Sequence, residues 1–171
     1  QPDTTIVNPV KCNSHVSSEI CGQCHSHALP VSESSRKTGR TYRAGAEFAS
    51  HLRKVGPGDT PDWLAQFWKD GTERAAGREF NGLAISACYL KGELSCSTCH
   101  SSHGGDRNHL ITPRMLTNEA CQSCHEKHVK QPEAHTHHAA NSSGSLCYNC
   151  HMPYTTYGLL KAIRSHQVSN P

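Results

Sequence analysis

Apolar residues are sparse along this chain, and the clearest helical pattern lies at residues 61–70. Large apolar side chains there recur four residues apart, in the pairs Trp63/Phe67 and Leu64/Trp68. This spacing would place each pair on one face of a helix. Thr60 and Pro61 precede the pattern as cap and first helical residue, and Gly71 follows it as a stop. We therefore predict a capped helix over 61–70 whose aromatic face packs on a core rather than forming a carbohydrate platform.

Three further helices are expected from weaker patterns. Thr72 would cap a helix that carries Ala76, Phe80 and Leu83 on one face. Short helices are also predicted within 117–129 and, after a threonine cap, within 155–165.

No segment alternates clearly enough between apolar and polar residues to predict a strand. Residues 30–45 have the composition of an exposed loop and carry four basic residues, namely Arg36, Lys37, Arg40 and Arg43. These charges would be solvated, or else would pair with anionic groups or steer an acidic partner. The predicted fold class is therefore mainly α with extensive irregular loops and few or no strands.

The composition raises the question of what fills the interior. Leu, Ile, Val and Phe together number 26 of 171 residues, about 15%, against roughly 20% for a chain that builds its own core. Disorder normally accompanies a large net charge, yet 17 basic and 14 acidic residues leave only +3 here. No apolar run approaches the roughly 18 residues that a membrane span needs. A bound group is therefore expected to supply the core.

Eight of the ten cysteines form four C-x-x-C pairs, and each pair is followed at once by histidine. We call these motif 1 to motif 4: Cys21–Cys24 with His25, Cys96–Cys99 with His100, Cys121–Cys124 with His125, and Cys147–Cys150 with His151. C-x-x-C-H is the attachment pattern of c-type haem, in which two thiols bind the porphyrin covalently and the histidine ligates iron. Zinc sites do not require the histidine, and disulfides do not favour this spacing. The sequence therefore predicts four haem c groups.

Four porphyrins would serve as the missing core. Haem c is attached outside the cytoplasm, so a periplasmic or extracellular location is expected, and the start at Gln1 without methionine leads us to expect a mature end left after export. Eight haem propionates would add eight negative charges to the formal net charge of +3, so the holoprotein is expected to be acidic or nearly neutral.

Cys12 and Cys88 belong to no motif. In an oxidising compartment two spare thiols would most simply form one disulfide, which would tie the N-terminal segment to the approach of motif 2. Free buried thiols and thiols that link separate chains are the alternatives.

The motifs are unevenly spaced within what we predict to be a single domain, residues 1–171. Seventy-five residues separate the first cysteines of motifs 1 and 2, whereas 25 and 26 separate the later ones. Residues 1–95 would therefore hold one haem and a long insertion, and 96–171 three closely spaced haems.

Ten further histidines compete for the distal side of the four irons. Met152 directly follows a proximal histidine and cannot reach the opposite face of that haem, so Met115 is the only plausible thioether ligand. Histidine at most or all distal positions is expected, which gives lower potentials than methionine would.

Three segments resemble the family of multihaem cytochromes related to hydroxylamine oxidoreductase and pentahaem nitrite reductase. They are SACYLKGELSCSTCHSSHGGD (86–106), HTHHAANSSGSLCYNCHMP (135–153) and RSHQVSNP (164–171), with a weaker likeness in FWKDGTERAAGREFNG (67–82). The resemblance implies four distal ligands, namely His103, His135, His138 and His166. His15 and His51 are the substitutes, and His137 could be confused with either neighbour.

The resemblance does not bring the chemistry of the enzymatic relatives, because no lysine-ligated C-x-x-C-K site occurs here. We expect an electron carrier rather than an enzyme, with redox proteins or other haem subunits as partners, in a possible homo-oligomer or filament. Nucleic acid is not expected as a partner, because the basic residues belong to no recognisable nucleic-acid-binding fold. The alternative is a redox enzyme acting on a nitrogen or sulfur oxyanion at one five-coordinate haem.

Overall fold

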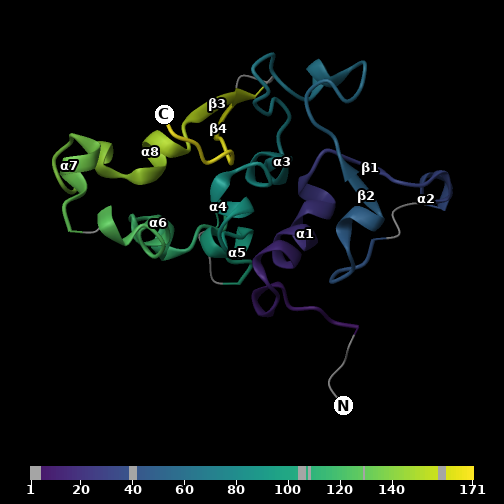
Figure 1. Cartoon of the computed structure of the whole chain (residues 1–171), viewed down its shortest axis with the longest axis horizontal. Helices are drawn as coiled ribbons and strands as arrows, with labels where there is room; N and C mark the ends of the chain where they lie inside the picture. Colours follow the sequence, from purple (N-terminus) through teal and green to yellow (C-terminus); the bar gives the residue numbers. More distant parts are fainter. Residues whose placement is uncertain (1–4, 39–41, 104–106, 108, 129, 158–160) are drawn as a thin grey trace.

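The structure is a computed structural model of the chain, and it describes all residues except 1–4, 39–41, 104–106, 108, 129 and 158–160. Short helices joined by irregular chain dominate it (Figure 1). The α-helices are α1 (Ser14–His25), α2 (Glu33–Thr38), α3 (Glu79–Leu83), α4 (Ala87–Leu90), α5 (Cys96–Cys99), α6 (Glu119–Gln122), α7 (Pro132–Thr136) and α8 (Cys147–His151). Single turns of 3-10 helix lie at Pro9–Lys11, Phe48–Ser50, Trp63–Ala65, Pro113–Met115, Glu126–His128 and Ser143–Ser145. The mainly helical, loop-rich character matches the prediction.

The prediction of few or no strands was only partly right, because the described residues contain two small antiparallel sheets. Strand β1 (Ala28–Pro30) pairs with β2 (Leu52–Lys54), and β3 (Tyr154–Tyr157) pairs with β4 (Lys161–Arg164). The helix predicted at 155–165 is therefore wrong. Its threonine and tyrosine residues favour strands, and Arg164 of β4 stacks on Tyr154 of β3, with the guanidinium carbon 4.4 Å from the ring centroid.

The helix predicted at 61–70 is also wrong beyond its first turn. Only Trp63–Ala65 forms a 3-10 turn, after which the chain reverses so that Phe67 bridges to Glu73. Gly71, at φ 88°, allows this reversal, since a positive φ favours glycine. The backbone hydrogen bond from the N–H of Trp68 to the carbonyl of Thr72, 2.8 Å long, replaces the helical ladder.

Thr72 does not cap the following helix. Its N–H and hydroxyl both bind Oδ1 of Asp70, and α3 begins only at Glu79. The prediction of a short helix within 117–129 is confirmed, because α6 lies there and is followed by one 3-10 turn. The expected loop at 30–45 includes α2 and begins at the end of β1, and its Arg40 lies outside the described residues.

Side-chain packing is concentrated in the N-terminal half. The main buried cluster consists of Tyr42, Phe48, Leu52, Phe80, Leu83, Ala84 and Tyr89. Helix α1 packs against α3 here. A Cβ at Gly22 would lie 2.3 Å from Cδ1 of Phe80, so the glycine between the cysteines of motif 1 admits this ring. The first haem motif is thereby anchored to the protein's own core.

The C-terminal half has much less apolar burial. Helices α6, α7 and α8 form an arm to one side of the molecule (Figure 1), and the buried hydrophobic residues described between 96 and 171 are Met115, Ala120 and Tyr157. No described helix is long and apolar enough to cross a membrane.

Candidate haem sites

Each cysteine–histidine motif begins on or within a helix. Motif 1 occupies the last turn of α1, and motif 4 is α8. The cysteines of motif 2 lie in α5 with His100 just after its end, and motif 3 begins in α6. One helical turn brings the two cysteines of a motif to the same side of the chain. Three of the second cysteines are exposed, namely Cys24, Cys124 and Cys150. The thiols are thus arranged for attachment to one flat group per motif.

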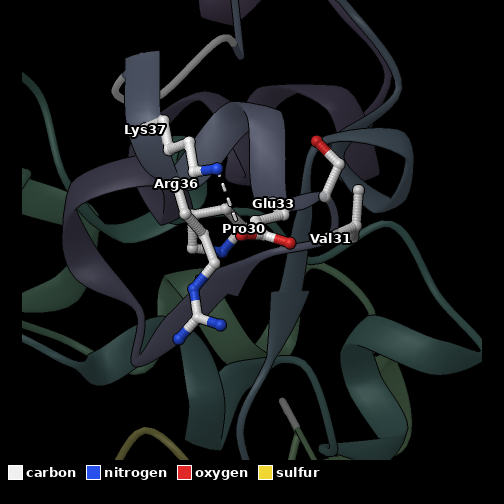
Figure 2. Close-up of a pocket in the computed structure, with 6 residues that line it drawn as sticks. Pro30, Val31, Glu33, Arg36 and Lys37 are labelled. Carbon is white, nitrogen blue, oxygen red and sulfur yellow. Dashed lines mark ion pairs between the residues drawn. The ribbon is translucent and has the colours of Figure 1, made fainter.

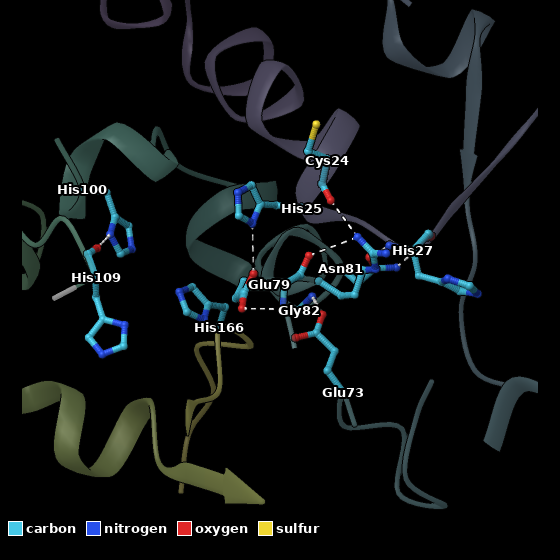
Figure 3. Close-up of polar contacts among 12 residues, drawn as sticks. Cys24, His25, His27, Glu73, Glu79, Asn81, Gly82, His100, His109 and His166 are labelled. Atoms are coloured by element: carbon cyan, nitrogen blue, oxygen red, sulfur yellow. Dashed lines mark hydrogen bonds and ion pairs between the residues drawn. The ribbon is translucent and has the colours of Figure 1, made fainter. Parts of the chain in front are cut away.

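Three of the four motif histidines have Nδ1 beside a protein oxygen. His100 Nδ1 lies 2.7 Å from the carbonyl of His109, and His151 Nδ1 lies 2.8 Å from the carbonyl of Ser169. His25 Nδ1 lies 3.4 Å from Oε2 of Glu79 (Figure 3). An Nδ1 proton donated in this way fixes the tautomer and leaves Nε2 as the lone-pair donor for a metal.

Two motif histidines also face a second histidine. The ring centroids of His100 and His166 are 6.1 Å apart with planes inclined by 18°, and those of His151 and His135 are 6.0 Å apart at 3°. His166 and His135 were both predicted as distal ligands, and the structure brings each of them to a motif histidine. No such facing pair involves His25 or His125 among the described residues.

The surroundings of His166 keep its imidazole neutral. Burial lowers the pKa of His166, and the nearby His100 lowers it further, while Glu79 acts in the opposite direction. Its Nδ1 lies 3.1 Å from the carbonyl of Arg164. A neutral imidazole with Nδ1 occupied is the form that binds a metal.

His103 and His138 are not brought to a motif histidine by any ring contact in the described part of the chain. His103 is exposed, and its backbone hydrogen-bonds with the hydroxyl of Ser101. The ring of His138 lies over Gly144, where a Cβ would come within 2.4 Å of it. Their assignment as ligands stays a prediction.

His128 is one of the ten further histidines but was not among the four predicted distal ligands. Its ring centroid lies 4.4 Å from that of His135, and its pKa is lowered by burial and then by His135, with smaller effects of Lys127, His125 and His151. It follows His125 by three residues, just as His103 follows His100. That repeated spacing was the available signal.

The first cysteines of the motifs lie near each other in two pairs. Cys21 and Cys96 are close enough to affect each other's pKa, as are Cys121 and Cys147. The Cys96 thiol lowers the pKa of Cys21 to about 6, and the Cys21 thiol, followed by burial, raises the pKa of Cys96. Burial raises the pKa of Cys121 to about 12, with a contribution from Cys99 of motif 2.

The same kind of hydrogen bond, from a backbone N–H to a side-chain oxygen, joins both pairs of motifs. The hydroxyl of Ser18 accepts the N–H of Cys96 at 3.3 Å, and Oδ1 of Asn118 accepts the N–H of Cys147 at 2.8 Å. Ser18 and Asn118 each lie three residues before the first cysteine of their own motif. We call motifs 1 and 2 the first unit and motifs 3 and 4 the second unit, because the two are joined in the same way.

The donor set of these motifs fits haem c. Cysteine pairs lie one turn apart, Nε2 is left free on three histidines, and a second histidine faces the motif histidine at two sites. The two remaining thiols, Cys12 and Cys88, are free in the structure, so it does not support the predicted disulfide between them.

A cavity of about 360 Å³ lies beside α2, away from the motifs (Figure 2). Its lining comprises Pro30, Val31, Ser32, Glu33, Arg36 and Lys37. Lys37 Nζ lies 3.3 Å from Oε1 of Glu33 within the same helix. At least this charge of the basic segment is therefore paired locally rather than with a distant anionic group.

Comparison with known proteins supports a c-type cytochrome with more than one haem. Residues 90–130, which contain motifs 2 and 3, match the family described as Doubled CXXCH motif (Paired_CXXCH_1). No curated protein and no solved structure matches the chain.

Proposed function

We propose that the chain is a tetrahaem electron-transfer protein with one haem c at each motif and histidine on both sides of at least the second and fourth irons. The cysteines of each motif would hold the porphyrin. The motif histidines would supply the proximal ligands, and His166 and His135 the distal ligands at motifs 2 and 4.

The two facing histidine pairs carry this proposal. Iron–nitrogen bonds are about 2 Å long, so two imidazoles on opposite faces of one iron would have ring centroids about 6 Å apart. The measured separations of 6.1 and 6.0 Å have this span. Nδ1 of His100 and Nδ1 of His166 both face a carbonyl, which leaves each Nε2 available to a metal.

Bound haem c supplies a one-electron Fe(III)/Fe(II) couple. The chain's part is to hold the sites close together and in order. The Ser18–Cys96 hydrogen bond joins motif 1 to motif 2, and the Asn118–Cys147 hydrogen bond joins motif 3 to motif 4. Cys99 lies close enough to Cys121 to affect its pKa. Helix α5 lies between α1 and α6 in Figure 1. These contacts support a relay in which the motifs follow one another in sequence order.

The location and partners of this relay are part of the proposal. Covalent haem attachment takes place outside the cytoplasm, so the protein would work in the periplasm or outside the cell. It would exchange electrons with redox proteins or with haem subunits, including further copies of itself. Exchange through haem edges needs no substrate pocket, which fits a carrier rather than an enzyme.

A second candidate function rests on the first and third motifs. Because no facing histidine is described for His25 or His125, a haem at either motif with an open position could bind a small oxyanion. Carbon monoxide separates the two functions, since it binds reduced iron only where a position is open. A carrier saturated with ligands should show a wholly low-spin spectrum and no carbon monoxide shift. A stoichiometric adduct with steady turnover of a nitrogen oxyanion would favour the enzyme.

The haem count is tested by the intact mass of the denatured holoprotein. Thioether bonds survive unfolding, so the expected mass is the polypeptide plus four haems. Three haems or fewer would contradict the tetrahaem proposal. Alkylation of the same sample before and after reduction tests Cys12 and Cys88, because only a disulfide would require the reductant.

A further inference from the structure

Glu79 is placed between the histidines of two neighbouring sites. It lies in the first turn of α3 and its side chain is 19% exposed. Oε2 is 3.4 Å from Nδ1 of His25, the motif histidine of site 1. The negative charge of the carboxylate also raises the pKa of the buried His166, which faces the motif histidine of site 2. Figure 3 shows Glu79 with His25 on one side and His166 on the other.

The carboxylate is held in this position by other groups. Oε1 accepts the backbone N–H of Gly77 at 3.1 Å and the hydroxyl of Tyr157 at 3.4 Å. Tyr157 is buried at the end of β3, far from Glu79 in the sequence. One oxygen is thus fixed by the chain just before α3 and by β3, which leaves the other directed at His25.

His25 differs from the other oriented motif histidines in the oxygen that its Nδ1 faces. His100 and His151 each face a neutral backbone carbonyl. A carboxylate draws the Nδ1 proton more strongly than a carbonyl does, because the hydrogen bond is charge-assisted. The imidazole then gains anionic character and becomes a stronger donor to a metal.

We propose that Glu79 is a positioning residue for the first haem site, which orients His25 and gives that haem a lower reduction potential than its neighbour at motif 2. This rests on the proposed function. The stronger donor and the nearby negative charge both stabilise ferric over ferrous iron. Electrons that enter at site 1 therefore move on to site 2, and the relay has a direction.

The test is a redox titration of the four-haem protein with Glu79→Gln, together with low-temperature electron paramagnetic resonance of the oxidised form. The amide keeps the shape of the side chain and removes its charge. One midpoint should rise by about 59 mV, which corresponds to a tenfold change in that haem's reduction equilibrium, and no other midpoint should rise by as much. The g values of one low-spin ferric signal should change with it.

Glu73→Gln is the matched control, with parent and variants titrated at pH 9, where a Glu73 carboxyl with a pKa of about 8 is ionised and its substitution also removes a charge. Glu73 lies in the same region, but its Oε1 accepts the N–H of Gly82 rather than contacting a motif histidine. All four midpoints should stay where they are in the parent. Glu79→Asp keeps the charge but shortens the side chain, so it should move the same midpoint in the same direction by a smaller amount.

Two outcomes would overturn the inference. The first is a Glu79→Gln or Glu79→Asp variant that retains four haems and has the same midpoints and g values as the parent. The other is an equal shift with Glu73→Gln. A parent protein that lacks four haems or shows no reversible one-electron steps would instead contradict the proposed function.

Discussion

The oxygen that faces Nδ1 determines how each motif histidine can act. For His100 and His151 this oxygen is a carbonyl that lies later in the chain, at His109 and Ser169. His109 has a φ of 72°, a conformation that costs energy for a residue with a side chain. The turn that presents its carbonyl to His100 is thus stabilised by the rest of the site.

Removal of His166 tests the distal assignment. His166→Ala should convert one haem to a high-spin form that binds carbon monoxide, while the mass still shows four haems, because the distal nitrogen sets the ligand field but takes no part in covalent attachment. The control is His137→Asn, since His137 is exposed at φ 58° and asparagine tolerates this conformation. The control should keep the parent's spectrum. A low-spin spectrum unchanged in His166→Ala would exclude this residue as a ligand.

Glu73 should make stability depend on pH. Burial raises its pKa from 4.5 to about 8 in the folded chain. The folded state therefore holds a proton that the unfolded state releases, so the free energy of unfolding is highest below pH 4.5 and falls as pH rises through about 8.

Glu73→Gln removes this dependence while an amide oxygen can still accept the Gly82 N–H. Above pH 8 the variant should be more stable than the parent by about 1–4 kcal/mol, and at pH 4 the two should be nearly equal. Urea denaturation followed by circular dichroism at both pH values measures the difference. Parallel pH profiles for parent and variant would show that Glu73 ionises normally.

The β3–β4 hairpin is the element that fixes motif 4. Arg164 of β4 donates to the carbonyls of Tyr148 and Met152 at 3.0 and 3.1 Å and to Oδ1 of Asn149. Its guanidinium also stacks on the ring of Tyr148, 4.5 Å from the centroid. One side chain thus binds both residues between the cysteines of the motif and the residue after its histidine.

Arg164→Lys should destabilise the holoprotein by about 1–3 kcal/mol, because an ammonium group cannot reproduce the planar stacking and the forked hydrogen bonds. The exposed Lys161 of the same strand supplies the control. Lys161→Gln should change the free energy of unfolding by no more than about 0.5 kcal/mol. Equal effects of the two substitutions in urea denaturation would mean that the Arg164 contacts contribute little.

At the scale of the whole molecule, the two halves of the chain rely on different cores. The cluster around Phe80 includes residues from 42 to 89 and packs against α1. Between 96 and 171 the described buried apolar residues are few, whereas three of the four motifs lie there. Haem is therefore expected to contribute most of the apolar contacts in the C-terminal half.

Chain produced without haem attachment, with its thiols kept reduced, should show this difference in limited proteolysis. We expect early cleavage throughout 96–171 and slower cleavage of the segment that contains the Phe80 cluster, since local opening is easiest where few apolar contacts oppose it. The holoprotein, treated in parallel, should resist cleavage in both halves. Uniform resistance of the haem-free chain would contradict a haem-dependent C-terminal half.

The secondary structure was predictable only where no contact with a distant part of the chain overrode the local sequence pattern. The mainly helical class and the irregular loops were expected, yet the chain reverses within 61–70 and the described residues of 155–165 pair as strands. In the first case the bond from Trp68 Nε1 to the carbonyl of Thr156, 2.8 Å long, ties the turn to β3. Helical spacing could not reveal a partner so distant in the sequence.

The sequence by itself determined the attachment chemistry, because two thiols and a histidine within five consecutive residues need no distant part of the chain. The tertiary structure decided which histidines face each other, which motifs are joined and where Glu79 lies. His166 reaches His100, and Ser18 reaches Cys96, only after long intervening segments have folded. Spacing along the chain determines which nearby residues can bind the same group. A contact between residues that are far apart in the sequence depends instead on how the whole segment between them folds.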